Sequence, residues 1–491
     1  MAAYLKRLLG ALGAYQIASI LQKLLAVLLL PVYTGRIAPG GHGIVETLAT
    51  FVIFVSIVAR FGIIESFLRY YFIDEDPARR DALVRRSVLF LVATTTVTCA
   101  VLVIPAAPLA RLITSEHVPA AFRWSVLGIW SFTNLELAQA VLRVDERLRA
   151  YAIVNSINVA VTVAASLVLV IGLNKGYEGL LIANFGTSTV VLFGLWWHLR
   201  RRLNLIPAGT AAESFRTLFR FGLPTVPAEA SVYALSVLDR QYIVHSQGTY
   251  AAGRYAIAMK VAGAIAFIVT AFQYAWPPLA YSVGDDAQAA RLYSLVTTYY
   301  ALITGWVVAG LALEDRFIIR LLTPHPGYFG SYRAIPWVSL GWAMYGLWVV
   351  LLVVAGRAKI TSRNFPAALV GLVVNVVLLI VLVPRFGIAG GGIALCGAYV
   401  AMLGVMHMLI RRAFPVSFEW RRLAQLAVVI GGLAVAGDLL LPTSGLGGFV
   451  TRALVFLAIG PVLWVTGFVH RAELDQGLAT LRGLRGRIGS A

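Results

Sequence analysis

Fourteen apolar stretches, each long enough to cross a membrane, fill most of this 491-residue chain. A membrane-spanning helix needs about 20 mostly apolar residues, because it must cover about 30 Å of hydrocarbon. The chain is 59% hydrophobic and 13% charged, whereas soluble domains are about 45–50% apolar and about 25% charged. The sequence therefore predicts an all-α polytopic membrane protein with 14 transmembrane helices. The predicted spans cover residues 11–33, 44–64, 87–105, 124–143, 151–171, 177–199, 220–245, 251–276, 291–312, 334–356, 364–383, 388–410, 423–441 and 449–469.

The charge balance excludes several classes of function. Lys and Arg number 41 against 22 Asp and Glu, a net charge of +19. In a soluble protein this excess would suggest nucleic acid, but here most of the charges lie between the spans, where topology signals belong, so we expect no nucleic-acid binding. Cys99 and Cys396 lie inside predicted spans, and the seven histidines form no ligand spacing, so we expect no metal and no cofactor. The sequence also lacks a P-loop pattern, so we do not expect direct ATP hydrolysis.

The distribution of basic residues predicts the orientation of the chain. About three times as many Lys and Arg residues fall on one side of the predicted spans as on the other. That side is the cytoplasm and holds both termini, which predicts a multi-pass protein of the bacterial inner membrane. The apolar run after Lys6 and Arg7 is too long for a signal peptide, so we interpret it as the first span.

Two short matches indicate an internal repeat. GYEGLLIA at Gly176 resembles GIAGGGIA at Gly387, which lies 211 residues later, and the segments around Gly43 and Gly253 match at a spacing of 210. Two tandem six-span units have the same orientation, so their pseudo-twofold axis runs along the membrane normal, with the substrate site between them. The predicted parts are an N-terminal six-helix lobe (1–206), a C-terminal six-helix lobe (207–415), two extra helices (416–470) and a basic cytoplasmic tail (471–491).

Charged residues inside the predicted spans are the candidates for function. Each costs about 2.5–3.5 kcal/mol at mid-bilayer, so these side chains must face one another or a wet cavity. They either hold the helices together through ion pairs and hydrogen bonds, or line a cationic cavity that suits an anionic ligand. The candidate substrate-binding residues of a cationic central cavity are Lys23, Arg60, Arg240 and Lys260. Glu136 and Asp239 are candidates for ion coupling or ion pairing.

Helical spacing places these polar residues on stripes. The stripes are Gln16, Ser19 and Lys23; Glu46, Thr50 and Arg60; Glu136, Gln139 and Arg143; and Glu229, Tyr233, Ser236 and Arg240. For a further stripe that includes Asn155, Asn158 and Ser166 we expect helix packing. Glu46, Glu229 and Arg143 lie near span ends, where we expect the headgroup interface. Pro224 and Pro227 are either a gating bend or ordinary helix-start prolines.

The order of motifs resembles that of polysaccharide-repeat-unit flippases, the Wzx-type branch of the MATE/oligosaccharidyl-lipid flippase (MOP) superfamily. In the first half the resemblance rests on residues 28–72, with the span end at Pro31–Thr34, a loop at Gly43 and Arg69–Tyr70–Tyr71. In the second half it rests on three features: the Leu-Pro start and Asp239–Arg240 pair of 221–243, then Gly253–Arg254–Tyr255, and the hairpin at 375–394.

The resemblance implies a V-shaped pair of six-helix bundles that flips a polyprenyl-diphosphate-linked oligosaccharide from the cytoplasmic to the outer leaflet. It implies that Lys23, Arg60 and Lys260 engage the lipid diphosphate, although relatives have Arg at some of these places. It also implies that spans 13 and 14 form a groove for the polyprenyl tail, with Asp438 at its outer edge. The implied partners are this lipid-linked oligosaccharide, membrane lipids, and the polymerase and glycosyltransferases of the same pathway.

Other functions stay open at this point. Sequence alone separates a peptidoglycan lipid-precursor flippase poorly from a polysaccharide flippase. A MATE-type multidrug or cation exporter would favour acidic residues in the first span, where this chain has Lys23. A membrane glycosyltransferase or polymerase belongs to a different class. Its only signal is Asp74–Glu75–Asp76, which is more simply interpreted as a solvated acidic turn, so we expect no enzymatic activity and no catalytic residues.

Overall fold

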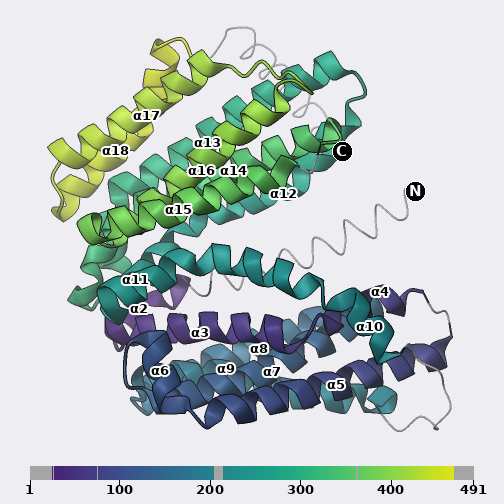
Figure 1. The fold of residues 1–491 in the computed structure, drawn as a ribbon. Helices are drawn as coiled ribbons and strands as arrows, with labels where there is room; N and C mark the ends of the chain where they lie inside the picture. Colours follow the sequence, from purple (N-terminus) through teal and green to yellow (C-terminus); the bar gives the residue numbers. More distant parts are fainter. Residues whose placement is uncertain (1–24, 26, 74–75, 204–213, 361–362, 469–491) are drawn as a thin grey trace, which may run out of the picture. The chain divides into compact units, whose positions relative to one another are not determined.

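The computed structural model describes residues 25, 27–73, 76–203, 214–360 and 363–468. All regular secondary structure in these residues is helical (Figure 1). The chain separates into two compact units. Unit 1 comprises Met1–Ile257, Leu322–Gly330 and Val383–Ile388, and unit 2 comprises Ala258–Leu321, Ser331–Leu382 and Ala389–Ala491. The lobes of 1–206 and 207–415, which come from the sequence repeat, stay a prediction.

Ten helices of the described part are long and apolar enough to cross a membrane, or up to 11 if a bent pair is counted as one span. The protein is therefore a multi-pass membrane protein. The ten overlap predicted spans 2, 3, 5, 6 and 9–14. They are Pro39–Ala59, Pro77–Val103, Arg149–Gly172, Gly176–Arg200, Asp286–Leu322, Pro326–Arg357, Asn364–Phe386, Ile388–Ile410, Trp420–Leu440 and Gly445–Val465.

The other four predicted spans do not correspond to any of these ten helices. The first lies mostly outside the described residues, as does the tail of 471–491. The fourth overlaps α7 (Pro119–Val144), which is not among the ten. The seventh and eighth overlap α11 (Thr225–Ala262) and α12 (Ala264–Ser282), where the chain bends by 49°. Because the described residues contain 10 or up to 11 candidate spans, the total of 14 spans stays a prediction.

Unit 1 is built around α7. In Figure 1 the long helices of this unit lie side by side, and α7 packs against α3, α5, α8 and α9. The helices are α2 (Leu30–Thr34), α3 (Pro39–Ala59), α4 (Ile63–Tyr71), α5 (Pro77–Val103), α6 (Ala106–Thr114), α7, α8 (Leu148–Leu167) with the π-helix η1 (Val168–Gly172), α9 (Gly176–Leu203), α10 (Phe215–Gly222) and α11 up to Ile257.

The structure corrects the predicted second span of 44–64 at both ends. α3 begins at Pro39, so Gly43 lies inside a helix and not in a loop. α3 ends at Ala59, and α4 begins at Ile63 after Gly62, whose φ of 69° is left-handed. Glycine adopts this conformation without steric cost, so it breaks the helix directly after Arg60. The predicted single span is therefore two helices joined at Arg60–Gly62.

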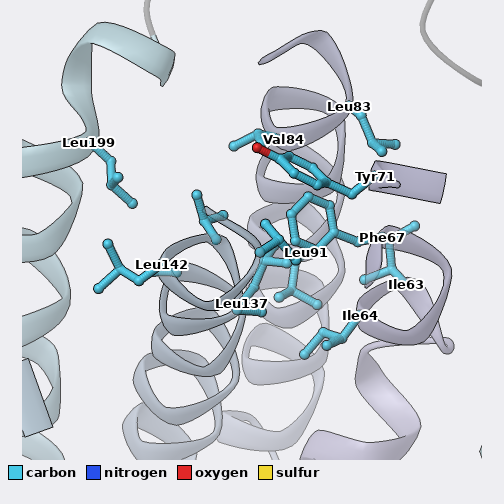
Figure 2. Close-up of a cluster of buried hydrophobic side chains, with 14 of the residues drawn as sticks. Ile63, Ile64, Phe67, Tyr71, Leu83, Val84, Leu91, Leu137, Leu142 and Leu199 are labelled. Carbon is cyan, nitrogen blue, oxygen red and sulfur yellow. The ribbon is translucent and has the colours of Figure 1, made fainter. Parts of the chain in front are cut away.

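Apolar side chains from five helices form the core at one end of unit 1. The helices are α4, α5, α7, α9 and α10, and their buried residues meet in one cluster (Figure 2). The residues labelled there are Ile63, Ile64, Phe67, Tyr71, Leu83, Val84, Leu91, Leu137, Leu142 and Leu199. This cluster fixes α4 beside α7, and so fixes the break at Arg60–Gly62 relative to α7.

A polar network closes this cluster. Arg202, at the end of α9, donates to Asp81 and Asp145 at 2.5 Å each, and the Tyr71 hydroxyl donates to Asp145 at 2.6 Å. Burial alone would lower the pKa of the Arg202 guanidinium, but the bonds to Asp145, Tyr71 and Asp81 raise it above its usual value. The network ties together the ends of α4, α5, α7 and α9.

Unit 2 contains the remaining helices. α12 packs against α14, and the last two helices, α17 and α18, lie beside one another (Figure 1). The helices are α12, α13 (Asp286–Leu322), the 3-10 helix η2 (Pro326–Ala334), α14 (Ile335–Arg357), α15 (Asn364–Phe386), α16 (Ile388–Ile410), α17 (Trp420–Leu440) and α18 (Gly445–Val465), of which Leu322 and parts of η2, α15 and α16 fall in unit 1.

Candidate functional site

Arg60 stands at the centre of the candidate site, in unit 1. It caps the C-terminus of α3, where the helix dipole favours a positive charge. Its side chain is 4% exposed. Nη1 donates to Glu136 Oε2 at 2.9 Å, and Nη2 donates to Glu229 Oε1. Glu65 Oε1 lies 3.7 Å from the same Nη2.

The carboxylates around Arg60 outnumber it three to one. Glu65 comes from α4, Glu136 from α7 and Glu229 from α11. Their side chains are 30%, 34% and 38% exposed, so the guanidinium lies beneath a layer of carboxylates that can still be reached. A buried guanidinium without partners would be costly, and these carboxylates compensate its charge and pair with both terminal nitrogens. We call these four residues the Arg60 cluster.

Glu229 reaches Arg60 because α10 docks on α4. Gly62 and Gly222 touch through their backbones, and a Cβ added to either would collide with the carbonyl oxygen of the other. The Ser66 hydroxyl donates to the Leu218 carbonyl at 2.6 Å, which fixes the same contact. α11 begins at Thr225, directly after this contact, so Pro224 and Pro227 take ordinary positions at a helix start.

The two predicted polar stripes of residues 44–64 and 220–245 face each other. The Tyr233 hydroxyl donates to the Thr50 carbonyl at 3.3 Å, and Arg240 Nη1 lies 4.0 Å from Glu46. With the Arg60–Glu229 pair, these contacts show α11 running antiparallel to α3. Ser236 instead donates to its own helix. Side chains of the two stripes therefore pair at Arg60 with Glu229 and at Arg240 with Glu46, whereas the Thr50 hydroxyl, like that of Ser236, donates within its own helix.

Asp239 has partners other than the side chain of Arg240. It is 6% exposed. One carboxylate oxygen accepts from the Tyr255 hydroxyl at 2.5 Å, and the other accepts from the backbone amide of Arg240 at 2.8 Å. Asp239 is thus a hydrogen-bonded buried carboxylate, which fits the structural alternative for this residue. Sequence analysis did not single out Tyr255 as its partner.

The structure brings together only part of the predicted set. Arg60 and Glu136 meet directly, whereas Arg240 lies further along α11 beside Glu46. Lys260 is half-buried near the end of α11, and Lys23 lies outside the described residues. Sequence analysis missed Glu65, because the break at Gly62 removes it from the helical stripe of Arg60. Glu229 is a partner of Arg60, and its expected place at the headgroup interface stays a prediction.

Other predicted features concern packing. The Gln139 amide donates to the Asn155 side chain at 3.2 Å, which links α7 to α8, and Ser166 donates within its own helix. These contacts support the packing interpretation of the stripe that contains Asn155. In the described part of the chain, no group of three or more His, Cys, Asp or Glu residues is arranged to hold a metal ion.

A family model described as "Polysaccharide biosynthesis protein" matches residues 36–324, more than half of the chain. The chain belongs to this family. The match covers the Arg60 cluster and the facing stripes of α3 and α11. The family match agrees with the polysaccharide-biosynthesis part of the resemblance, while membership of the Wzx-type branch stays a prediction. A comparison with curated proteins finds no match.

Solved structures of two kinds share this fold. The inward closed conformation of the Lipid II flippase MurJ is 13% identical, with a TM-score of 0.68 over 93% of this chain and 99% of that chain. An inward-facing multidrug resistance MATE family transporter of the MOP superfamily is 12% identical, with a TM-score of 0.61 over 84% and 95%. A mutant of the Vibrio cholerae MATE transporter VcmN is 13% identical, with a TM-score of 0.57 over 84% and 97%. The chain therefore shares the fold of the Lipid II flippase MurJ and of the MATE transporters.

Proposed function

We propose that this protein is a flippase of surface polysaccharide biosynthesis. It translocates a polyprenyl-diphosphate-linked oligosaccharide from the cytoplasmic to the outer leaflet of the bacterial inner membrane by alternating access, and both of its termini lie in the cytoplasm. The observation that carries this proposal is the buried guanidinium of Arg60, which is set at a helix break and covered by side chains that can be reached. A planar guanidinium binds phosphate oxygens through two parallel N–H bonds.

The proposed mechanism uses the charge of the headgroup. Arg60 is the proposed anchor for the diphosphate, and Lys23, Arg240 and Lys260 are proposed to supply further positive charge. The diphosphate carries about two negative charges, so outward movement down an inside-negative potential gains roughly 4–5 kcal/mol per 100 mV. Glycosyltransferases would supply the substrate, and a polymerase would consume it. Their action and the potential together would drive net export.

We propose further that the chain consists of 14 spans in two repeated halves. Two observations support the repeat. Gly176 and Gly387, matched at a spacing of 211, both adopt left-handed conformations, with φ of 55° and 58°, directly before or at the start of a helix. Gly43 and Gly253, matched at a spacing of 210, pack against each other through their backbones. Equivalent residues that meet each other lie on a twofold axis.

A second candidate is a peptidoglycan lipid-precursor flippase. The specific observation in its favour is the fold match to the Lipid II flippase MurJ, which extends over 93% of this chain. The family match supports polysaccharide biosynthesis instead. Both candidates transport a polyprenyl-diphosphate headgroup, so they assign the same role to Arg60 and differ in the sugar.

Reconstitution into liposomes tests both candidates. We expect the purified protein to transfer a fluorescent undecaprenyl-diphosphate oligosaccharide between leaflets, and Arg60→Ala to slow this transfer at least tenfold by removing the phosphate anchor. Arg333→Ala, which changes an exposed arginine, is the matched control. Preference for Lipid II over a polysaccharide repeat unit would establish the second candidate. Transfer at the wild-type rate by Arg60→Ala would refute the assignment of Arg60.

A further inference from the structure

Each terminal nitrogen of the Arg60 guanidinium already donates one hydrogen bond to a carboxylate. Nη1 donates to Glu136, and Nη2 donates to Glu229 and lies near Glu65. Nε is buried and has no hydrogen-bond partner among the described residues. A diphosphate that takes one of these two occupied positions must replace the carboxylate that holds it. Since three carboxylates already surround one cation, the cluster would also repel a dianion until one of them moves away.

The three carboxylates are not equally able to leave. Glu136 lies within α7, the helix that packs against α3, α5 and α9. Glu65 is 3.7 Å from the guanidinium, beyond hydrogen-bond distance, so its departure would free no donor. Glu229 accepts a hydrogen bond from Nη2 and lies near the start of α11. Its side chain is the most exposed of the three, at 38%.

The backbone around Glu229 also favours exchange at this position. α10 is fixed on α4 by the Gly62–Gly222 contact and the Ser66–Leu218 hydrogen bond. α11 starts only after Leu223 and Pro224, so Glu229 belongs to a separate helix from the docked α10. Its attachment to Arg60 is one of the contacts that hold the start of α11 against α3. Loss of that contact would release this end of α11, while α10 stays in place.

We propose that Glu229 is the exchangeable ligand of Arg60, displaced from Nη2 by an oxygen of the substrate's diphosphate. The inference rests on the proposed function and adds a regulatory residue to it. Without substrate, Glu229 satisfies the buried guanidinium and holds α11 on α3. With substrate, the diphosphate takes over Nη2, Glu136 keeps Nη1, and the start of α11 is released. Headgroup binding is thereby linked to a change at α11.

Binding of farnesyl diphosphate to the full-length protein in detergent tests the displacement. Glu229→Gln removes the competing charge but keeps the size of the side chain. We expect it to tighten farnesyl diphosphate binding about tenfold, because the diphosphate no longer displaces a charge-assisted hydrogen bond. Glu65→Gln is the matched control, because Glu65 makes no hydrogen bond to Arg60, and we expect a change of less than about threefold.

A double-mutant cycle separates this inference from the proposed function. Arg60→Gln should weaken farnesyl diphosphate binding at least tenfold, and Glu229→Gln should have no further effect in that background. If Arg60→Gln binds normally, the anchor fails and the proposed function loses its main support. If Arg60→Gln weakens binding but Glu229→Gln does not tighten it in the wild-type background, the anchor stands and the displacement is refuted.

Leaflet transfer provides a readout that a structural role would not produce. Glu229→Gln should bind farnesyl diphosphate more tightly yet transfer the lipid-linked oligosaccharide more slowly, because α11 is no longer held and released in each cycle. If Glu229→Gln fails to fold, Glu229→Asp serves instead, since its shorter side chain keeps the charge but reaches Nη2 less well. It should tighten binding by a smaller factor. Unchanged or weaker binding in a folded variant would overturn the proposal.

Discussion

At the scale of the residue, two buried arginines are satisfied by different acceptors. Arg60 is held by carboxylates of other helices, which can be exchanged for phosphate. Arg452, in unit 2, is fully buried and donates mainly to the backbone carbonyls of Leu313, Pro442 and Leu441 at 2.7, 3.0 and 3.3 Å, with Asp438 Oδ1 3.5 Å from its Nη1. A backbone carbonyl cannot leave without a local change in the backbone that carries it. Arg452 therefore joins α18 to α13 and the end of α17, as a structural residue.

Replacement of Arg452 tests this structural role. Arg452→Met keeps most of the apolar volume but leaves three carbonyls without their donor, so we expect a loss of about 3–5 kcal/mol in stability. Thermal melting of the purified protein should show a lower midpoint than the wild type. Arg333→Met, at an exposed position, should melt like the wild type. Equal midpoints for the two variants would contradict the assignment.

The sequence could place both arginines in or beside a membrane span, but it could not separate their roles. The positive charge and the hydrophobic surroundings are local properties of the chain. The acceptors are not local, since Glu136 and Glu229 lie 76 and 169 residues from Arg60. Helical spacing did predict which faces of α3 and α11 are polar, because a stripe depends only on the period of one helix. Which stripes meet depends on packing.

At the scale of the element, the contact between α4 and α10 positions the Arg60 cluster. Sequence analysis read residues 44–64 as one helix, because an apolar run gives no sign of a break. The break depends on Gly62, which combines a φ of 69° with close backbone contact to Gly222. The left-handed conformation of Gly62 and its contact with Gly222 can be recognised only once α10 is placed against α4. The same contact sets the distance between Arg60 and the start of α11.

Replacement of Gly222 should weaken this contact. Gly222 is helical, so Gly222→Ala adds a clash with the carbonyl of Gly62 and with the Ser66 hydroxyl, and we expect a cost of about 1–3 kcal/mol. Separation of α10 from α4 should speed tryptic cleavage at Arg216 and Arg220. Gly194→Ala is the control, because a Cβ at Gly194 meets nothing within 4 Å. If both variants are cleaved at the same rate, α10 does not depend on this contact.

At the scale of the whole molecule, the proposed repeat requires that the contact between α3 and α11 at Gly43 and Gly253 is symmetric. A Cβ at Gly43 would collide with the carbonyl of Thr249, and a Cβ at Gly253 would collide with the carbonyl of Pro39. Both pairs, 43 with 253 and 39 with 249, are separated by 210 residues, the period that the sequence predicts. The two helices therefore cross in a geometry that looks the same from either side. This is the arrangement expected where a pseudo-twofold axis passes between them.

This symmetry predicts that two distant substitutions act alike. Gly43→Ala and Gly253→Ala each push a methyl group into the same crossing from opposite sides, so each should cost about 1–3 kcal/mol of stability, with similar values. The double variant should cost less than the sum, because the first methyl already separates the helices. Thermal melting measures all three variants, with Gly40→Ala as the control, since its Cβ would meet only the Thr249 hydroxyl at 3.7 Å. A large effect at one glycine and none at the other would place the axis elsewhere.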